Sequence, residues 1–453
     1  MNATSVSEPI SINTPIRFND PLPEEVDVAI IGAGVIGVFS ALYLQRLGRR
    51  VLLCEKGRVA AEQSSRNWGW IRQHGRDAAE LPITRQAVQL WHQADRETEG
   101  ACGIKTVGIH YLASNEKELA KLHNWMEVAN AHDMDSYVMS RAQVNSLFGR
   151  QANSQWLGGT CTPSDARGEP WQAVPAVARL AHSEGVLIRE NCAVRDIDTR
   201  AGAISGIITE SGTTRCEQVV LCGGAWSSLF AHRLGVRIPQ LSVEATVVQT
   251  QPMDAGVEGS WADEELAMRA RADGGYSLAC ADRHGVFVGP GSFRHALKFI
   301  PLLRTSWADV QLQGLTPPGY PDAWKLARQW QAHDTTPFER MRVLEPPAHR
   351  GRVARICQRF AQRFPALPPV EVQNSWSGMI DVMPDVVPVV DAVPSFPGFY
   401  MATGMSAHGF GIGPGYGRAV ARLLQGLPAE HDLRRFRLSR FSDGSRLEVG
   451  PSL

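Results

Sequence analysis

The stretch from Val26 to Glu55 constrains the fold of this chain more than any other part of its sequence. Residues 26–31 alternate and then run apolar, as a buried parallel strand does, and they lead directly into glycines at positions 32, 34 and 37. Residues 38–47 are expected to form a helix, and residues 51–54 a second strand. This order of strand, glycine-rich turn, helix and strand is typical of a βαβ unit that binds a dinucleotide.

Each glycine of that unit, and the acidic residue at its end, has a physical role. Gly32 permits a tight turn, Gly34 lets the backbone approach a pyrophosphate, and Gly37 lets the helix pack close to the strand. The helix N-terminus offers unpaired N–H groups to phosphates, and the carboxylate of Glu55 is placed to bind ribose hydroxyls. The pattern alone does not separate FAD from NAD. The binding residues expected from it are Gly32, Gly34, Val35, Ile36, Gly37, Glu55 and Lys56.

Charge and cysteine content argue against several other classes of function. Lys plus Arg and Asp plus Glu number 46 each in the 453 residues, so no electrostatic feature favours a nucleic-acid partner. The eight cysteines form no C-x-x-C pair, which argues against a metal cluster or a disulfide framework and fits a reducing compartment. We therefore expect a cytoplasmic protein without a metal site.

Hydropathy gives no sign of a membrane-spanning segment. Residues 1–23 lack a long apolar core, so they are expected to form a flexible lead-in rather than a signal peptide. No stretch approaches the roughly 18 apolar residues that a membrane span needs. A peripheral contact with the inner face of a membrane stays open.

Three further segments could bring backbone and polar groups to the same dinucleotide. A polar segment follows the second strand, a strand at 218–222 runs into paired glycines, and a strand at 398–402 leads to a glycine-rich loop before a helix expected at 416–424. The N-terminus of that helix would stabilise negative charge on a reduced flavin. The residues expected to bind are Ser64, Ser65, Arg66, Asn67, Trp68, Gly69, Cys222, Gly223, Gly224, Trp226, Gly404, His408, Gly409, Phe410 and Gly411.

Together these motifs resemble the D-amino-acid oxidase family of flavoproteins, which includes D-amino-acid dehydrogenase, glycine oxidase and sarcosine oxidase. The resemblance covers roughly residues 26–425 in the family's motif order, with a softer match from Trp376 to Asp385. It implies bound FAD, with Val194 contacting the adenine through its backbone. It also implies oxidation of the C–N bond of an amino acid or secondary amine by hydride transfer to the flavin, giving an imine that hydrolyses to a keto acid or aldehyde.

The family fold implies an α/β protein with two domains. A Rossmann-like FAD-binding domain, a parallel sheet between helices, would comprise residues 24–97, 164–236 and 373–430. A discontinuous substrate domain built on a mixed antiparallel β-sheet would comprise residues 98–163 and 237–372 and would cover the reactive face of the flavin. Residues 431–453 would form a C-terminal extension.

Candidate catalytic residues follow from the substrate's chemistry and from the family's loops. A substrate carboxylate is best bound by a fixed arginine, and Arg72, just after the polar segment, is the first choice, with Arg76 second. His74 and His408 are expected near the flavin ring, His408 because it lies in a cofactor loop. No dedicated base is required, since the flavin performs the redox step.

Two departures from sarcosine oxidases affect the cofactor and the substrate. Gly411 stands where those enzymes usually carry a lysine that helps bind the substrate carboxylate, and Gly378 aligns with the cysteine that holds their flavin covalently. We therefore expect non-covalent FAD, and sarcosine itself is a less favoured substrate.

Other classes of function remain open at this stage. The nearest rival is an FAD-dependent 2-hydroxy-acid dehydrogenase of the same fold. An NAD-dependent dehydrogenase would explain the βαβ unit but would leave the Ser64 and His408 segments without a role, and a third possibility is a non-catalytic flavin-binding partner of a larger complex. The sequence does not say whether O₂, a quinone or another carrier accepts the electrons.

Overall fold

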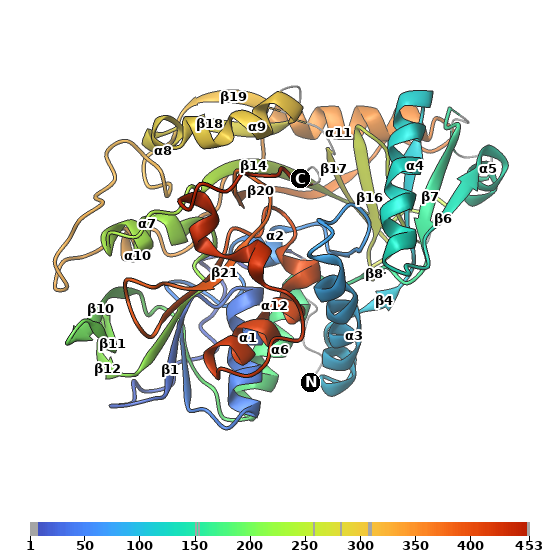
Figure 1. Ribbon diagram of the computed structural model, residues 1–453. Coiled ribbons are helices and arrows are strands. Elements are labelled where there is room, and N and C mark those ends of the chain that lie inside the picture. Colours follow the sequence, from blue (N-terminus) through green and yellow to red (C-terminus); the bar gives the residue numbers. More distant parts are fainter. Residues whose placement is uncertain are drawn as a thin grey trace.

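The computed structural model describes residues 8–149, 152, 155–256, 259–280, 283–306 and 310–450. Within them the chain forms a mostly parallel sheet and a larger mixed sheet, with helices packed against both (Figure 1). The expected α/β class, with a Rossmann-like sheet and a second sheet of mixed antiparallel type, is confirmed.

The parallel sheet contains the expected βαβ unit. Its strand order is β21-β22-β13-β1-β2-β9, and neighbouring strands are parallel except for β21 and β22. Strands β1 and β2 are buried along their whole length, because a parallel sheet of this type carries packed elements on both faces. The strands are β1 (Val28–Ile31), β2 (Val51–Cys54), β9 (Leu187–Arg189), β13 (Gln218–Leu221), β21 (Val389–Ala392) and β22 (Phe399–Thr403).

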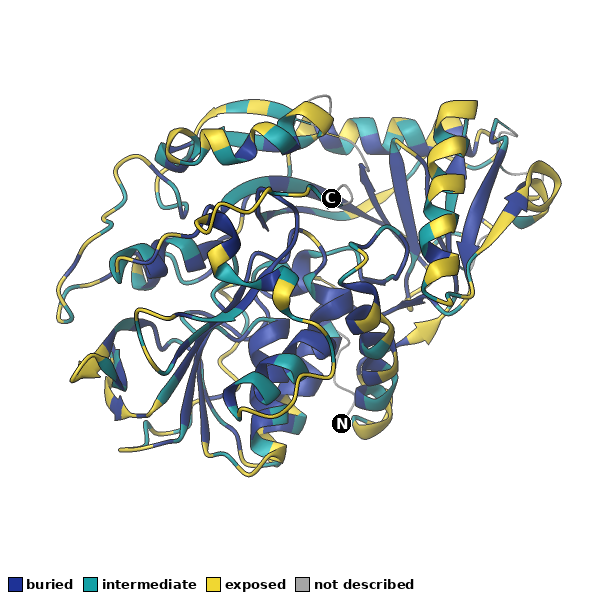
Figure 2. Cartoon of the chain, viewed as in Figure 1, coloured by how far each residue is buried: buried dark blue, intermediate teal, exposed yellow. Residues whose placement is uncertain are grey.

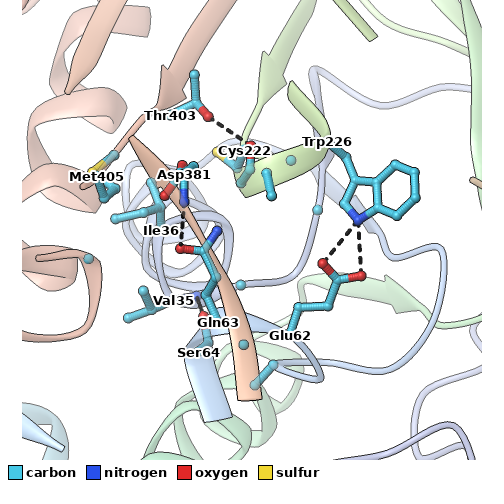
Figure 3. Close-up of a pocket in the computed structure, with 18 of the residues that line it drawn as sticks. Val35, Ile36, Glu62, Gln63, Ser64, Cys222, Trp226, Asp381, Thr403 and Met405 are labelled. Carbon is cyan, nitrogen blue, oxygen red and sulfur yellow. Dashed lines mark hydrogen bonds between the residues drawn. The ribbon is translucent and has the colours of Figure 1, made fainter. Parts of the chain in front are cut away.

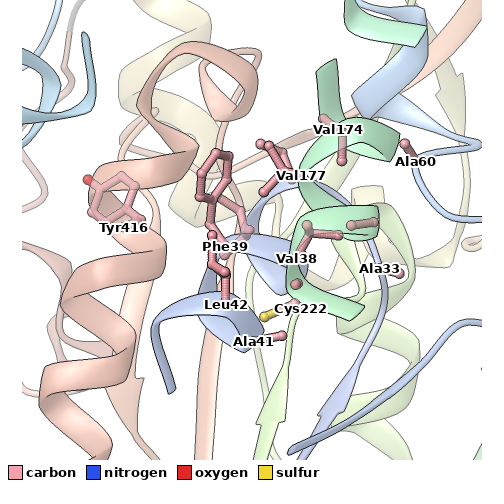
Figure 4. Packing of buried hydrophobic residues seen from close by; sticks show 14 of the residues in the cluster. Ala33, Val38, Phe39, Ala41, Leu42, Ala60, Val174, Val177, Cys222 and Tyr416 are labelled. Atoms are coloured by element: carbon pink, nitrogen blue, oxygen red, sulfur yellow. The ribbon is translucent and has the colours of Figure 1, made fainter. Parts of the chain in front are cut away.

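Helix α1 forms the centre of the core beside this sheet. Its residues Phe39 and Leu42 lie among side chains of α6 and α12 (Figure 4). Glycine permits the close approach of α12, since a Cβ on Gly417 would lie 2.5 Å from the Cβ of Phe39. The helices packed here are α1 (Val35–Arg46), α3 (Leu81–Glu97), α6 (Pro170–Ser183) and α12 (Gly409–Leu424).

The mixed sheet lies above the parallel sheet in Figure 1. Its strand order is β19-β18-β14-β17-β16-β15-β5-β7-β6, and β20 pairs with β14 outside that path. Its strands are β5 (Ile109–Ala113), β6 (Tyr137–Ser140), β7 (Gly158–Thr162), β14 (Leu241–Thr250), β15 (Ser260–Ala262), β16 (Leu266–Ala270), β17 (Tyr276–Cys280), β18 (His284–Val288), β19 (Val310–Leu315) and β20 (Val372–Val382).

Two small sheets and several shorter helices complete the described chain. The small sheets have the orders β3-β8-β4 and β10-β11-β12. Their strands are β3 (Trp70–Ile71), β4 (Lys105–Thr106), β8 (Ala166–Arg167), β10 (Val194–Arg200), β11 (Ala203–Thr209) and β12 (Gly212–Arg215). The helices are α2 (Gln63–Arg66), α4 (Glu116–Ala131), α5 (Arg141–Phe148), α7 (Ser227–Arg233), α8 (Pro290–Arg294), α9 (Ala296–Ser306), α10 (Pro337–Arg340), α11 (Arg350–Arg363) and the 3₁₀ turns η1 (Gly224–Trp226), η3 (Arg434–Phe436) and η4 (Leu438–Phe441).

Both glycine-rich helices begin earlier than the sequence predicted. Helix α1 begins at Val35 rather than residue 38, and α12 begins at Gly409 rather than residue 416. Glycine and proline weaken helices in isolation, so residues 409–415, which include Pro414, resemble a loop. In the folded chain these residues are buried against neighbouring elements, and this packing outweighs the poor helix propensity.

Two strand boundaries are set by backbone conformation, and one domain assignment needs correction. The stretch 105–113 is divided into β4 and β5, because Gly108 between them takes a φ of 69°. Strand β21 begins only at Val389, because Val386 has a φ of 61° that no regular strand allows. Residues 373–382, assigned above to the FAD-binding segments, belong to β20 and hydrogen-bond β14 in the mixed sheet.

The expected flexible lead-in is packed along much of its length. Ile10 and Phe18 are buried, and the backbone N–H of Ile10 donates to Ser65 Oγ at 3.2 Å. These contacts hold residues 10–18 against the parallel-sheet region. Residues 1–7 of the lead-in and 451–453 of the C-terminal extension lie outside the described residues.

Candidate cofactor and substrate site

A large cavity lies where the carboxyl ends of β1, β2, β13 and β22 face strands β14 and β20 of the mixed sheet. Its volume is about 1840 Å³, counted with the part that opens to solvent. Ligands of open α/β sheets bind beyond the carboxyl ends of the strands. The expected binding residues in its wall are Gly32, Gly34, Val35, Ile36, Glu55, Lys56, Ser64, Arg66, Asn67, Trp68, Arg72, Val194, Cys222, Gly223, Gly224, Trp226, Gly409 and Phe410.

The remaining expected residues lie behind this wall. A Cβ on Gly37 would lie 1.9 Å from the carbonyl oxygen of Gly32, so this glycine sets the close contact between α1 and the turn. A Cβ on Gly411 would lie 3.1 Å from the carbonyl oxygen of Trp70, so Gly411 packs on β3. The residues outside the cavity wall are Gly37, Ser65, Gly69, His74, Gly404, His408 and Gly411.

Two glycines outside the wall have backbone roles. Gly69 and Gly404 have φ values of 84° and 76°, in the left-handed region that favours glycine. The N–H of Gly404 donates to Asp381 Oδ2 at 2.8 Å, which ties the loop before α12 to β20.

The βαβ turn has the geometry that a pyrophosphate needs. Gly32 has a φ of 102°, and a Cβ there would lie 2.6 Å from the carbonyl oxygen of Cys222. Helix α1 has no side-chain cap at Gly34 and no acidic residue in its first turn, so its N-terminus can receive an anion. The Glu55 carboxylate accepts from the N–H groups of Ala33 and Gly57, each at 2.8 Å, and keeps further lone pairs for hydroxyl donors.

The polar segment is partly helical and supports that turn. Ser64 lies in α2, and its Oγ accepts from the N–H of Val35 at 2.9 Å (Figure 3). Asn67 closes the end of α2, since its amide donates to the carbonyl of Ser64 at 2.9 Å and accepts from the N–H of Gly69 at 2.8 Å. The side chain of Arg66 forms an ion pair with Glu345. This segment fixes the wall beside the α1 N-terminus.

Sequence reasoning missed three polar residues of the wall. Glu62 accepts from Trp226 Nε1 at 3.0 Å and forms an ion pair with Lys56 (Figure 3). Gln63 Oε1 accepts from the backbone N–H of Asp381 at 3.4 Å, and burial raises the pKa of the Asp381 carboxyl to about 6. Asp381 lies inside the softer family match from Trp376 to Asp385, so the sequence marks its segment. Glu62 and Gln63 lie just before Ser64, where the polar motif begins.

Two arginines line one part of the cavity. Arg72 donates to Tyr111 Oη at 2.8 Å and to the carbonyl of His74 at 3.1 Å, which fixes its guanidinium. Arg76 is 3% exposed, and its Nη1 has no hydrogen-bond partner among the described residues. Burial and the neighbouring Arg72 lower the pKa of Arg76 to about 9. A buried guanidinium with an unused donor is a strong binding group for an anion.

The two candidate histidines surround these arginines. His408 caps α12, is 1% exposed, and places Nε2 at 3.5 Å from Arg72 Nη2. His74 stacks on Tyr111 with the ring centroids 3.9 Å apart. Burial, together with the nearby guanidiniums, holds the pKa of both histidines well below the usual range, so both rings are neutral at pH 7. The two imidazole rings therefore lie beside the guanidiniums of Arg72 and Arg76 without adding positive charge.

A buried carboxyl beside this group predicts a measurable pH dependence of stability. Burial raises the pKa of Asp165 to about 7, while an unfolded aspartate titrates near 4. The stability that its protonated form contributes is present below about pH 4 and is lost as the pH rises through about 7. We expect Asp165→Asn to raise the free energy of unfolding at pH 8 by a few kcal/mol, because the substitution removes the cost of ionising this buried carboxyl.

Chemical denaturation at pH 5 and pH 8 measures this effect. The gain in Asp165→Asn should be clearly smaller at pH 5 than at pH 8. The exposed Asp432 is the matched control, because Arg434 already lowers its pKa to about 2 and Asp432→Asn should give the same effect at both pH values. Equal effects of Asp165→Asn at the two pH values would contradict the prediction.

The wall fits a dinucleotide that carries a flavin. Glycine turns from three parallel strands approach the cavity, and a Cβ on Gly34 would lie 3.2 Å from Ser64 Oγ, so a side chain there would narrow the phosphate position. Val194 lies in the wall beyond Glu55, where an adenine contact is expected. Trp68, Trp70 and residues of β14 and β20 also line the cavity and provide apolar surface for a ring system.

Similarities to known proteins support this conclusion. Sarcosine dehydrogenase of Mus musculus mitochondria is 23% identical over 92% of this chain and 42% of its own length, so the chain spans well under half of that relative. Sarcosine oxidase subunit beta of Rhizobium meliloti is 24% identical over 94% of this chain and 91% of its own length. The solved L-amino acid deaminase of Proteus myxofaciens, in complex with anthranilate, is 26% identical with a TM-score of 0.89 and covers 95% of this chain and 97% of its own.

The family model described as FAD dependent oxidoreductase matches residues 27–423. That match covers the βαβ unit, the polar segment, both sheets and α12, which are the elements that build the cavity. The expected family resemblance is confirmed by this match, and the family's description names FAD, the expected cofactor. The protein belongs to the DAO family of FAD-dependent oxidoreductases.

Proposed function

We propose that this protein oxidises the C–N bond of an amino acid whose carboxylate is bound by Arg72 and Arg76. The single observation that carries the proposal is the pair of guanidiniums in the cavity wall, one of them buried with an Nη1 that no described residue bonds. The relatives named for sarcosine and for L-amino acids are named for compounds that contain both an amine nitrogen and a carboxylate, which supports this substrate class.

Each part of the site has a distinct task in this reaction. Bound FAD supplies the hydride acceptor. Arg72 and Arg76 hold the carboxylate and fix the orientation of the adjacent carbon. Their positive charge also disfavours an ammonium ion beside them, so the substrate amine is bound in its neutral, reactive form. Trp68 and Trp70 limit the access of water, and the released imine hydrolyses to a keto acid or aldehyde.

Turnover with matched compounds tests the proposal. For one side chain, the panel contains both enantiomers of the amino acid, its N-methyl derivative, the 2-hydroxy acid and the decarboxylated amine. We expect turnover of an amino acid or N-methyl amino acid to exceed that of the other compounds. The 2-hydroxy-acid dehydrogenase alternative predicts that the hydroxy acid is the best substrate, and that outcome would overturn the proposal.

FAD is expected to be bound without a covalent link. The position matched to the flavin-linking cysteine is Gly378, whose Cβ position would contact the side chain of Arg66. Cys222 lines the cavity, but burial raises the pKa of its thiol, so the nucleophilic thiolate is disfavoured. Acid precipitation should leave the flavin in the supernatant and the pellet colourless. A yellow pellet that resists washing would contradict the prediction.

The location and the electron acceptor form the remaining part of the proposal. Among the described residues, no helix has both the length and the apolar character needed to cross a membrane. We propose a cytoplasmic location with peripheral contact at the inner face of a membrane, and electron delivery to O₂ or to a quinone or other carrier. Hydrogen peroxide yield in air, compared with reduction of a soluble quinone, distinguishes these acceptors.

A further inference from the structure

A second, smaller pocket lies away from the cofactor cavity, between α7, α8 and the segment 321–328. Its volume is about 450 Å³, counted with its opening to solvent. Asp322 is the acidic residue among its described lining residues, and that carboxylate is already bonded to the N–H of Gly291 at 2.9 Å and to Arg328 at 3.1 Å. The basic side chains in its lining are His232, Arg237, Arg294, His295 and Arg328, and the three arginines carry the positive charge, because the pKa of both histidines is lowered by burial.

These basic groups are close enough to act on one another. Burial first, and then the charges of Arg294, Lys298 and Arg237, lower the pKa of His295 to about 4. Arg237 and Arg294 are exposed at the pocket rim, where they can meet an incoming ligand. A group of basic side chains with one already paired carboxylate leaves an excess of positive charge. Such a pocket favours an anion with several oxygen acceptors, such as a phosphate ester.

Exposed apolar side chains continue from the rim of this pocket. Phe293 is 68% exposed and Leu297 is 82% exposed, and they lie on α8 and α9, the segment that carries Arg294. Exposed residues are frequent along this segment (Figure 2). The Phe293 ring contacts the 47% exposed ring of Trp324, with centroids 5.9 Å apart. Large apolar side chains next to basic ones are typical of protein segments that lie at a membrane interface.

We propose that this basic pocket binds the phosphate headgroup of an anionic phospholipid while Phe293, Leu297 and Trp324 enter the surface of the bilayer. The inference rests on the basic pocket and the exposed apolar side chains lying next to each other. The positive charge of the pocket binds the headgroup, and transfer of the apolar side chains out of water is favourable. The inference rests on the peripheral membrane contact proposed above. It is independent of the proposed oxidation, which is measured without membranes.

Vesicle sedimentation of the full-length holoenzyme tests this binding site. Binding is measured with vesicles of phosphatidylcholine alone and with vesicles that also contain phosphatidylglycerol. We expect binding to require phosphatidylglycerol. The variant Arg237→Glu/Arg294→Glu should lower the affinity at least about tenfold, since each basic residue at a membrane surface contributes substantially to binding. Leu297→Ser should lower it with the charge unchanged.

Two controls separate this site from general charge effects. Arg85 is an exposed arginine of α3, a helix that does not line the pocket. Arg85→Glu should therefore leave vesicle binding unchanged. Turnover of the substrate in vesicle-free buffer should be unchanged in the pocket variants, so a failure of the oxidation proposal is detected separately. Equal binding by all variants, equal binding to both vesicle types, or binding of inorganic phosphate without binding of vesicles would each overturn the inference.

Discussion

Arg76→Leu is expected to lower kcat/KM for an amino acid by about 30- to 4,000-fold while FAD stays bound. Removing one partner of a buried, charged hydrogen-bonded pair costs about 2–5 kcal/mol, and each 1.4 kcal/mol is a factor of ten. Arg76 lies in the cavity wall, and its Nη1 has no hydrogen-bond partner in the part of the chain that the structure describes. In the variant, Arg72 alone would hold the substrate carboxylate. Steady-state kinetics with the amino acid and with its decarboxylated amine measure the loss.

The decarboxylated amine provides the internal control for this result. It has no carboxylate, so its much lower turnover should change little in Arg76→Leu. Arg76→Lys keeps the charge but not the planar donor pair, and it should recover part of the activity. A thermal unfolding curve checks that the variant is folded, since Glu80 would lose its cationic neighbour. An equal loss for the amino acid and the amine would contradict carboxylate binding by Arg76.

Gly37→Ala is expected to abolish retention of FAD and to lower the free energy of unfolding. The added Cβ would lie 1.9 Å from the carbonyl oxygen of Gly32, so α1 or the turn must move. Overpacking of this kind costs about 1–3 kcal/mol, and the displaced turn is the one that approaches the pyrophosphate. Flavin absorbance per protein after gel filtration, and a denaturation curve, measure the two effects.

Gly48→Ala is the matched control for that variant. It adds the same methyl group where nothing lies within 4 Å, although its φ of 80° makes the change cost about 1–2 kcal/mol. We expect a modest loss of stability with full FAD content. A Gly37→Ala protein that keeps its FAD would show that close contact between α1 and Gly32 is not needed for the cofactor.

The parallel-sheet half of the fold could be predicted because its signals are local. Strand β1, Gly32 and Glu55 lie within one short stretch, and each has a distinct physical requirement. The start of α12 could not be predicted in the same way. Residues 409–415 form a helix because their glycines permit close packing against α1, β3 and α3, and those neighbours are far away in the sequence.

The candidate site shows the same difference between residues that a local pattern marks and residues that meet only in the folded chain. The glycine turns that reach the cavity were predictable, since each follows a recognisable strand. Arg76, Glu80 and Tyr416 meet only in the folded chain, where Tyr416 Oη donates to Glu80 at 3.2 Å. Asp381 lies in the segment with the softer family match, and the pairing of β20 with β14 places it between the two sheets. The local match marks this segment, whereas the position of Asp381 in the cavity wall depends on long-range strand pairing.

Anaerobic titration of the yellow holoenzyme with an amino acid tests the central claim most directly. The account predicts that the absorbance of oxidised flavin is lost as the amino acid is added, and that one keto acid or aldehyde forms for each flavin reduced. If the flavin stayed oxidised with every amino acid and amine but was bleached by a 2-hydroxy acid, carbon–nitrogen oxidation would be contradicted.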